Sequence, residues 1–240
     1  MESAATFDQA AHQYDLQLQK GLSLSGESSD YFVDGRVSHL RERLASRGFS
    51  PKRVLDFGCG VGNAMPTLCR EFSNSAYIGY DCSQESIAVA RSRFDDQSAG
   101  QDAVSWCSVS TGLKPQSFDL AYTSGVFHHI PPDARQEELE RIQRSLLPGG
   151  YFAFFENNPW NPGTRWVMSR IPFDRDAICL SVFEARRRLE SAGFDIAETR
   201  TLFFLPGMLG ALRFVEPWLS WTMLGAQYLV LARKPVEATP

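Results

Sequence analysis

Residues 53–63 read "RVLDFGCGVGN", a short apolar run followed by glycine at three alternate positions, Gly58, Gly60 and Gly62. A chain that leaves a strand and enters a helix can bring its bare backbone against a ligand only where the side chains are absent. The stretch therefore predicts a ligand-binding turn between a strand and a helix.

The spacing of these glycines argues against a dinucleotide. The dinucleotide fingerprint G-x-G-x-x-G requires glycine at position 63, where Asn63 stands. Asp56, near the end of the strand, would repel a pyrophosphate but attract an ammonium group. A cationic nucleoside without phosphate fits better, and a nicotinamide oxidoreductase is disfavoured.

The composition is that of one globular α/β domain. The chain has 240 residues, 43% of them hydrophobic, and a formal net charge of −4, which argues against a nucleic-acid partner. No run of about 18 apolar residues predicts a membrane span. The first residues lack the pattern of a secretory signal, so we expect a cytoplasmic protein. Five cysteines without a CxxC pair predict neither disulfides nor a metal site.

Short apolar runs alternate with amphipathic stretches, which is typical of a parallel sheet covered on both faces. The expected strands cover residues 53–58, 76–81, 103–108, 118–124, 151–156, 195–205 and 225–235. The expected helices cover residues 37–46, 83–94, 133–147 and 181–194.

The stretch "VLDFGCGVGN" resembles the first motif of the class I S-adenosylmethionine-dependent methyltransferases. The resemblance continues through "YIGYDCS", "FDLAYTSGVFHHI" and "LLPGGYFAFFE", so it covers about residues 50–160. It implies an α/β, Rossmann-like, mostly parallel seven-stranded sheet of order 3-2-1-4-5-7-6, with helices on both faces and the cofactor-binding core at residues 50–160. The length predicts a single domain over residues 1–240. The helical pattern before the glycine loop predicts an N-terminal helical lid at 1–35, and the aromatic residues near the C-terminal end predict a substrate-side insertion at 205–224.

The resemblance also implies which residues hold S-adenosylmethionine. Asp81, about twenty residues beyond the loop, would accept hydrogen bonds from both ribose hydroxyls. Arg36 either holds the cofactor carboxylate or faces solvent at the start of a helix. Cys82 and Ser83 would line the adenine, Ser108 would stand where the family often has an acidic residue, and Ser124 and Gly125 would approach the methionine end. The full predicted set is Arg36, Asp56, Gly58, Gly60, Gly62, Asn63, Asp81, Cys82, Ser83, Ser108, Ser124 and Gly125.

Candidates for the chemistry follow the fourth and fifth expected strands. His128 and His129 are the only adjacent histidines in the chain, and Glu156 closes the fifth strand. One of the three is expected to accept a proton from the methyl acceptor. The alternative is that the histidine pair only orders its loop. Residues 156–166, "ENNPWNPGTRW", with "PFD" at 172–174, resemble bacterial methyltransferases of the quinone-biosynthesis type.

The sequence thus predicts methyl transfer from S-adenosylmethionine to a small molecule by direct in-line displacement. An apolar or aromatic acceptor is expected, because aromatic residues are dense near the C-terminal end, at Phe203, Phe204, Phe214, Trp218 and Trp221. The alternative is that these residues only cap the edge of the sheet. The alternative is a relative of the same fold that binds the cofactor without transferring methyl, as a rearrangement catalyst or a partner subunit. The acceptor, the methylated atom and the oligomeric state are left open.

Overall fold

The structure is a computed structural model, and it describes residues 21, 26–97, 104–109, 112–171, 174 and 177–236. The predicted lid over residues 1–35 therefore lies mostly outside the described residues. Its described part is residue 21 with residues 26–35, which include the start of the first described helix.

The described chain alternates strands and helices. The strands are β1 (Arg53–Phe57), β2 (Ala76–Tyr80), β3 (Val104–Cys107), β4 (Phe118–Ser124), β5 (Leu146–Asn157), β6 (Asp195–Leu202) and β7 (Gln227–Arg233). The helices are α3 (Ser29–Ala45), α4 (Met65–Glu71), α5 (Gln84–Gln97), α6 (Arg135–Ser145), α7 (Pro162–Met168), α8 (Val182–Ser191), the 3-10 helix η4 (Gly207–Val215) and α9 (Glu216–Leu219).

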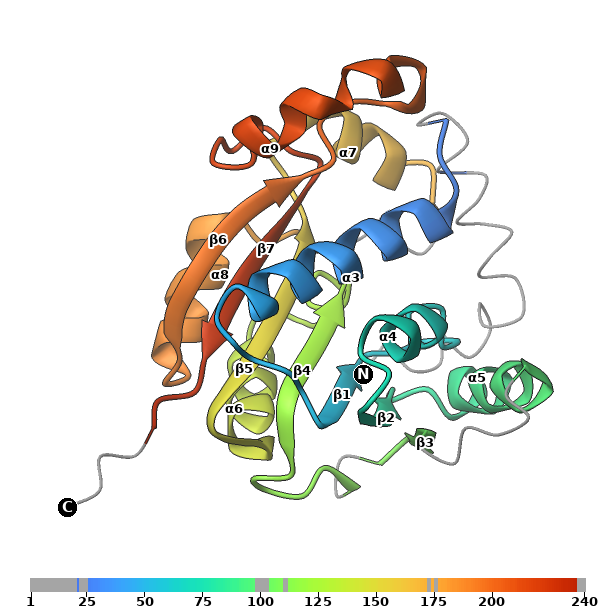
Figure 1. Cartoon of the computed structure of the whole chain (residues 1–240), viewed down its shortest axis with the longest axis vertical. Helices are drawn as coiled ribbons and strands as arrows, with labels where there is room; N and C mark the ends of the chain where they lie inside the picture. Colours follow the sequence, from blue (N-terminus) through green and yellow to red (C-terminus); the bar gives the residue numbers. More distant parts are fainter. Residues whose placement is uncertain are drawn as a thin grey trace.

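The seven strands form one sheet of order β3-β2-β1-β4-β5-β7-β6, which confirms the predicted topology (Figure 1). Strands β1 to β5 pair in parallel, whereas β7 runs antiparallel to both β5 and β6. Because the parallel strands point the same way, their carboxyl ends and the loops that follow them gather at one edge of the sheet.

Helices cover both faces of the sheet, as predicted. Helices α3 and α4 pack on one face, and α6 and α8 pack on the other (Figure 1). The alternation of side chains along a strand explains this division, since neighbours such as Val54 and Leu55 point to opposite faces. Two apolar cores therefore hold the sheet between its helices.

Several local expectations differ from the structure. The helix expected over residues 37–46 begins already at Ser29, where the Ser28 hydroxyl caps it by accepting a hydrogen bond from the Tyr31 amide. The helix expected over residues 133–147 ends at Ser145, because Leu146 turns into an extended conformation and pairs with Phe118 at the start of β5. The late strand expected to reach residue 205 ends at Leu202, and Phe203 follows with a φ of 61°. Helices α4 and α7 are short, and the periodicity of the sequence did not predict them.

Among the described residues, no helix combines the length and the apolar character that crossing a membrane requires.

The N-terminus of α8 provides a stability test. The Ser181 hydroxyl accepts a hydrogen bond from the Glu184 amide at 3.2 Å, which satisfies one of the amides that a helix start leaves without a partner. Ser181→Ala should lower the free energy of unfolding by about 0.5–2 kcal/mol in urea denaturation. Ser181→Asp keeps a capping oxygen and should retain most of that stability. Equal losses in both variants would rule out capping as the cause.

Candidate functional site

A cavity of about 890 Å³ lies at the carboxyl ends of the parallel strands. Its walls come from the loops after β1, β2, β4 and β5, from α3 and α7, and from the segment after β6. Nine of the twelve predicted cofactor residues and two of the three predicted catalytic residues line it. These lining residues are Arg36, Asp56, Gly58, Gly60, Asn63, Asp81, Cys82, Ser124, Gly125, His128 and His129.

The glycine loop is shaped by close contacts on both sides. Gly58, with a φ of 73°, lies so close to the loop after β4 that a Cβ atom there would stand 2.4 Å from Cγ2 of Val126. Asp81 fastens the loop from the end of β2. Its Oδ2 accepts a hydrogen bond from the Gly60 amide and its Oδ1 accepts one from the Ser83 amide, both at 2.9 Å. Hydrogen bonds therefore connect the glycine loop directly to Asp81, the carboxylate predicted to bind the ribose.

Asp56 is an acidic group with an unusual environment. Its side chain is buried at the end of β1, and its Oδ2 has no hydrogen-bond partner within the part of the chain that the structure describes. Burial and the negative charge of Asp81 raise the pKa of Asp56 to about 7, against a smaller lowering effect of Arg36. A cationic ligand in the cavity would favour the ionised form of this carboxyl.

Arg36 reaches the cavity from the middle of α3, so it does not face solvent at a helix start. Its Nε donates to the Tyr122 hydroxyl at 3.3 Å, and its Nη1 donates to Oε1 of Gln227 at 2.9 Å. Gln227 in turn donates to Oδ1 of Asn157 at 3.2 Å. This chain of polar groups joins α3 to β4, β5 and β7 along one wall of the cavity.

Three predicted cofactor residues, Gly62, Ser83 and Ser108, are not among the residues that line the cavity. The Ser83 side chain is fully buried, and its hydroxyl accepts a hydrogen bond from the Ser86 amide at 3.0 Å at the start of α5. Gly62 has a φ of 84°, and a Cβ atom there would stand 2.9 Å from the Trp106 ring. Their contact with a cofactor stays a prediction.

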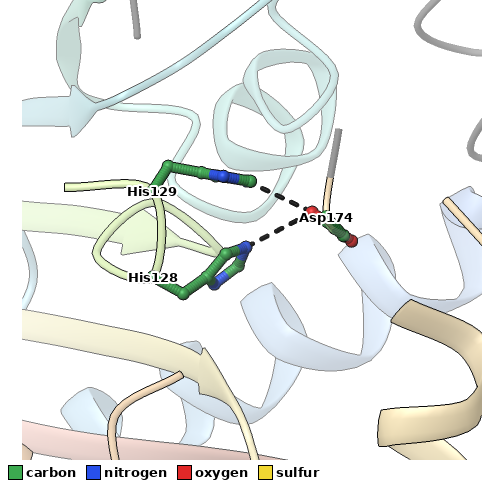
Figure 2. A group of neighbouring side chains, drawn as sticks. All are labelled: His128, His129 and Asp174. Carbon is green, nitrogen blue, oxygen red and sulfur yellow. Dashed lines mark ion pairs between the residues drawn. The ribbon is translucent and has the colours of Figure 1, made fainter. Parts of the chain in front are cut away.

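The polar end of the cavity is a cluster of two histidines and an aspartate (Figure 2). Nε2 of His128 lies 3.5 Å from Oδ1 of Asp174, and Nε2 of His129 lies 3.2 Å from the same oxygen. On its other side, Nδ1 of His128 lies 2.6 Å from Oε2 of Glu156. Glu156 is buried behind the histidine and also accepts a hydrogen bond from the Phe127 amide at 2.6 Å.

Burial and mutual charge shift the pKa values within this cluster. Burial alone would lower the pKa of His128, but the Glu156 charge and hydrogen bonds to both carboxylates raise it to about 10. Burial and the His128 charge lower the pKa of His129. Burial would raise the pKa of Asp174, but hydrogen bonds from the two histidines hold it at about 2. The cluster thus holds positive charge on His128 between two carboxylates.

Sequence reasoning missed Asp174, although it noted the stretch "PFD" that contains this residue. Glu156, one of the three predicted proton acceptors, contacts His128 but does not line the cavity, whereas Asp174 does. Nearby, Asn158 donates two hydrogen bonds to the carbonyls of Met223 and Gly225 and supports the turn after β5. Trp160 is exposed and outside the cavity.

The aromatic residues near the C-terminal end divide into two groups. Phe203 and Phe204 line the cavity together with Tyr31 and Phe32 of α3, and the Phe203 ring packs against both α3 rings. The second group is exposed and does not line the cavity. It consists of Phe214 of η4, Trp218 of α9 and Trp221, just after α9. The apolar wall therefore comes from the start of the predicted insertion and the residues just before it.

Comparison with known proteins agrees with this site. Residues 55–152 match the family model described as "Methyltransferase domain". The trans-aconitate 2-methyltransferase of Rhodopseudomonas palustris is 30% identical over 151 residues, which cover 62% of this chain and 56% of the relative. The indolepyruvate C-methyltransferase of Streptomyces griseus is 30% identical over 139 residues, which cover 56% of this chain and 41% of the relative. The chain thus spans about half the length of the curated relatives it matches.

Solved structures share the fold. A putative methyltransferase from Haloferax volcanii, in complex with the Trm112 methyltransferase activator, superposes with a TM-score of 0.62 at 19% identity and covers 95% of this chain and 97% of its own. An S-adenosylmethionine-dependent methyltransferase from Archaeoglobus fulgidus superposes with a TM-score of 0.59 at 18% identity and covers 82% of this chain and 94% of its own.

The fold and the glycine loop define a protein with a nucleoside-cofactor site at the carboxyl ends of a parallel sheet. The match over residues 55–152 and the order of the strands both support the resemblance to the class I S-adenosylmethionine-dependent methyltransferases. The match to a methyltransferase domain supports S-adenosylmethionine as the cofactor.

The close approach at Gly58 provides a test of the loop. Gly58→Ala should destabilise the protein through both its positive φ and a clash with Val126, whereas Gly48→Ala is a matched control. Gly48 has a φ of 66°, but a Cβ atom there would meet nothing within 4 Å, so only the conformational cost of about 1–2 kcal/mol applies.

Unfolding free energies of these variants, and of Gly58→Ala combined with Val126→Ala, separate the two effects. The double variant should show favourable coupling, because the shorter side chain removes the clash. A Gly58→Ala loss no larger than that of Gly48→Ala would contradict the close approach.

Proposed function

We propose that this protein transfers the methyl group of S-adenosylmethionine to a small, apolar or aromatic molecule by direct in-line displacement. One observation carries the proposal: the glycine loop with its Asp81 anchor and the cluster of His128, His129 and Asp174 line the same cavity. A cofactor held at the loop would present its methyl group toward the ends of β4 and β5, where the cluster lies.

The loop residues support a specific orientation of the cofactor. Asp81 stands at the end of β2, where its carboxylate can also accept hydrogen bonds from ribose hydroxyls, since each oxygen accepts more than one. Asp56 suits the ammonium group of the methionine end, and Arg36 suits its carboxylate. Ser124 and Gly125 would approach the same end from β4.

The remaining part of the cavity would take the acceptor. Its wall is apolar on the side of Phe32, Phe203 and Phe204, which supports an apolar or aromatic acceptor. Its polar end is the histidine cluster, so the reacting atom of the acceptor would lie there. Among the three predicted proton acceptors, His128 and His129 line the cavity, while Glu156 acts behind His128 as a positioning residue. Because the pKa of His128 is raised to about 10, this ring already carries a proton, and His129, whose pKa is lowered, is the candidate that can accept one.

The setting that we propose is the cytoplasm, with no nucleic-acid partner. All five cysteines are free thiols, which supports a reducing compartment. The net charge of −4 supports a small-molecule acceptor over a polyanion.

The direct test is incubation of the purified protein with methyl-labelled S-adenosylmethionine and fractionated small-molecule extracts. We expect label to enter an organic-soluble fraction while S-adenosylhomocysteine accumulates in equal amount. Binding of the cofactor without S-adenosylhomocysteine in any fraction would instead support the alternative, a fold relative that uses the cofactor without transferring methyl.

The ribose role of Asp81 can be measured directly. Asp81→Ala should weaken cofactor binding at least tenfold in calorimetry, because a charge-assisted hydrogen bond contributes about 1.5–3 kcal/mol. Asp81→Asn retains one acceptor oxygen and the size of the side chain, and it should lose less. Since Asp81 also accepts from the Gly60 amide, thermal unfolding of each variant must be recorded in parallel. Unchanged affinity in a folded Asp81→Ala variant would refute this role.

Asp56 predicts a pH dependence of cofactor binding. With a pKa near 7, this carboxyl is mostly neutral below that pH, so binding of an ammonium group to its ionised form must release a proton. Cofactor affinity should therefore fall as the pH decreases from about 8 to about 6. Of the charged groups around Asp56, Asp81 raises and Arg36 lowers its pKa. Asp56→Asn should flatten the profile, and an equally steep profile in that variant would assign the titration to another group.

A further inference from the structure

The cluster at the polar end of the cavity has the geometry of a three-ligand metal site (Figure 2). One ligand atom each from His128, His129 and Asp174 lies within 4.8 Å of the others. The two nitrogen-to-oxygen distances, 3.5 and 3.2 Å, resemble the separation of about 3.3 Å between neighbouring ligands of a tetrahedral zinc ion with bonds near 2.0–2.1 Å. Two of the three ligand-to-ligand distances therefore already suit a metal ion.

Glu156 supplies the support that a metal-binding histidine usually has. A ligating imidazole commonly donates its second ring N–H to a carboxylate, which fixes the tautomer and the direction of the ring. Oε2 of Glu156 lies 2.6 Å from Nδ1 of His128, so Nε2 is the atom that faces Asp174. Glu156 is itself held by the Phe127 amide, and the His128 carbonyl accepts from the Ile178 amide at 3.0 Å.

The charges buried in the cluster also favour a bound cation. Two carboxylates, Glu156 and Asp174, are buried at this point, and with neutral imidazoles they leave two negative charges inside the protein. Buried charges require partners of opposite sign. One proton on His128 offsets one of these charges, whereas a divalent cation offsets both. Arg135, the described guanidinium nearest in sequence to the loop, donates instead to the carbonyls of Ile130 and Ile178.

We propose that His128, His129 and Asp174 bind a divalent transition-metal ion of the zinc type, with Glu156 orienting His128 from behind. Two imidazole nitrogens and one carboxylate oxygen favour zinc, iron or cobalt over magnesium, which prefers oxygen ligands alone. All three ligands line the cavity, so a fourth coordination position would be open toward the acceptor.

The metal site also defines an acceptor class, and this part of the inference rests on the proposed function. An acceptor hydroxyl bound at the open position would lose its proton to water and present its oxygen to the methyl group. The new oxygen–carbon bond forms as the carbon–sulfur bond breaks, and the electron pair of the broken bond stays on sulfur, which becomes a neutral thioether. Metal binding itself is independent of this step.

The test uses the full chain after treatment with a chelator. Titration with Zn²⁺ against a chromophoric competitor should show one equivalent bound with micromolar or tighter affinity. His129→Ala and Asp174→Asn should each weaken binding at least a hundredfold, and Glu156→Gln should weaken it about 10–100-fold as an orienting partner. Glu190→Gln, which removes an exposed carboxylate on α8 away from the cavity, is the control and should leave the zinc affinity unchanged.

A second measurement guards against variants that fail to fold. Co²⁺ added to the wild-type chain should give visible absorption bands of a low-coordinate nitrogen and oxygen site. A thiolate charge-transfer band, no Zn²⁺ binding by the wild-type chain, or full affinity in folded His129→Ala and Asp174→Asn would each overturn the proposal.

Failure of the metal site and failure of the proposed function are distinguishable. Binding of S-adenosylhomocysteine and methyl transfer are measured on the metal-free and the zinc-loaded chain. Full methyl transfer by the metal-free chain overturns the role of the metal and leaves the proposed function standing. Specific Zn²⁺ binding with no methyl transfer to any fraction supports the metal site and contradicts the proposed function.

Discussion

A carboxylate that is buried inside a protein needs hydrogen-bond donors around it. Glu156, at the end of β5, is such a carboxylate. Its two oxygens are met by the Phe127 amide and the His128 ring, both from the loop after β4. Since an uncompensated buried charge costs several kcal/mol, this loop is held in the conformation that supplies both donors. The position of Val126 against Gly58, and with it the shape of the cavity floor, follows from the same loop.

Much of this arrangement could be predicted from the sequence because it depends on local patterns. Alternating apolar runs identified the strands, and the glycine spacing placed the loop between β1 and α4. The distance from that loop to Asp81 identified the carboxylate that ends β2 and fastens Gly60. The start of β5 was misplaced because Leu146 carries no signal that separates the last turn of a helix from the first residue of a strand.

The rest depended on contacts between distant segments. Asp174 follows α7 and belongs to none of the α-helices or strands that the structure describes, so no periodicity in the sequence predicted its contact with the histidines. Ser83 was expected at the adenine from its position alone, but a serine before a helix also serves as a cap, and its hydroxyl accepts from the Ser86 amide. Sequence identifies the residue type at each position, whereas the direction of the side chain depends on its neighbours.

The position of β7 has a consequence for synthesis of the protein. Strand β7 lies between β5 and β6 (Figure 1). Its Gln227 accepts a hydrogen bond from Arg36 of α3, near the other end of the described chain. Strands β5 and β6 leave the ribosome well before the strand that joins them, so β6 has no sheet to pair with until β7 emerges. The segments of the nucleoside loop emerge early, while the wall beside it can close only after β7 has emerged. Folding of the cavity is therefore coupled to synthesis of β7.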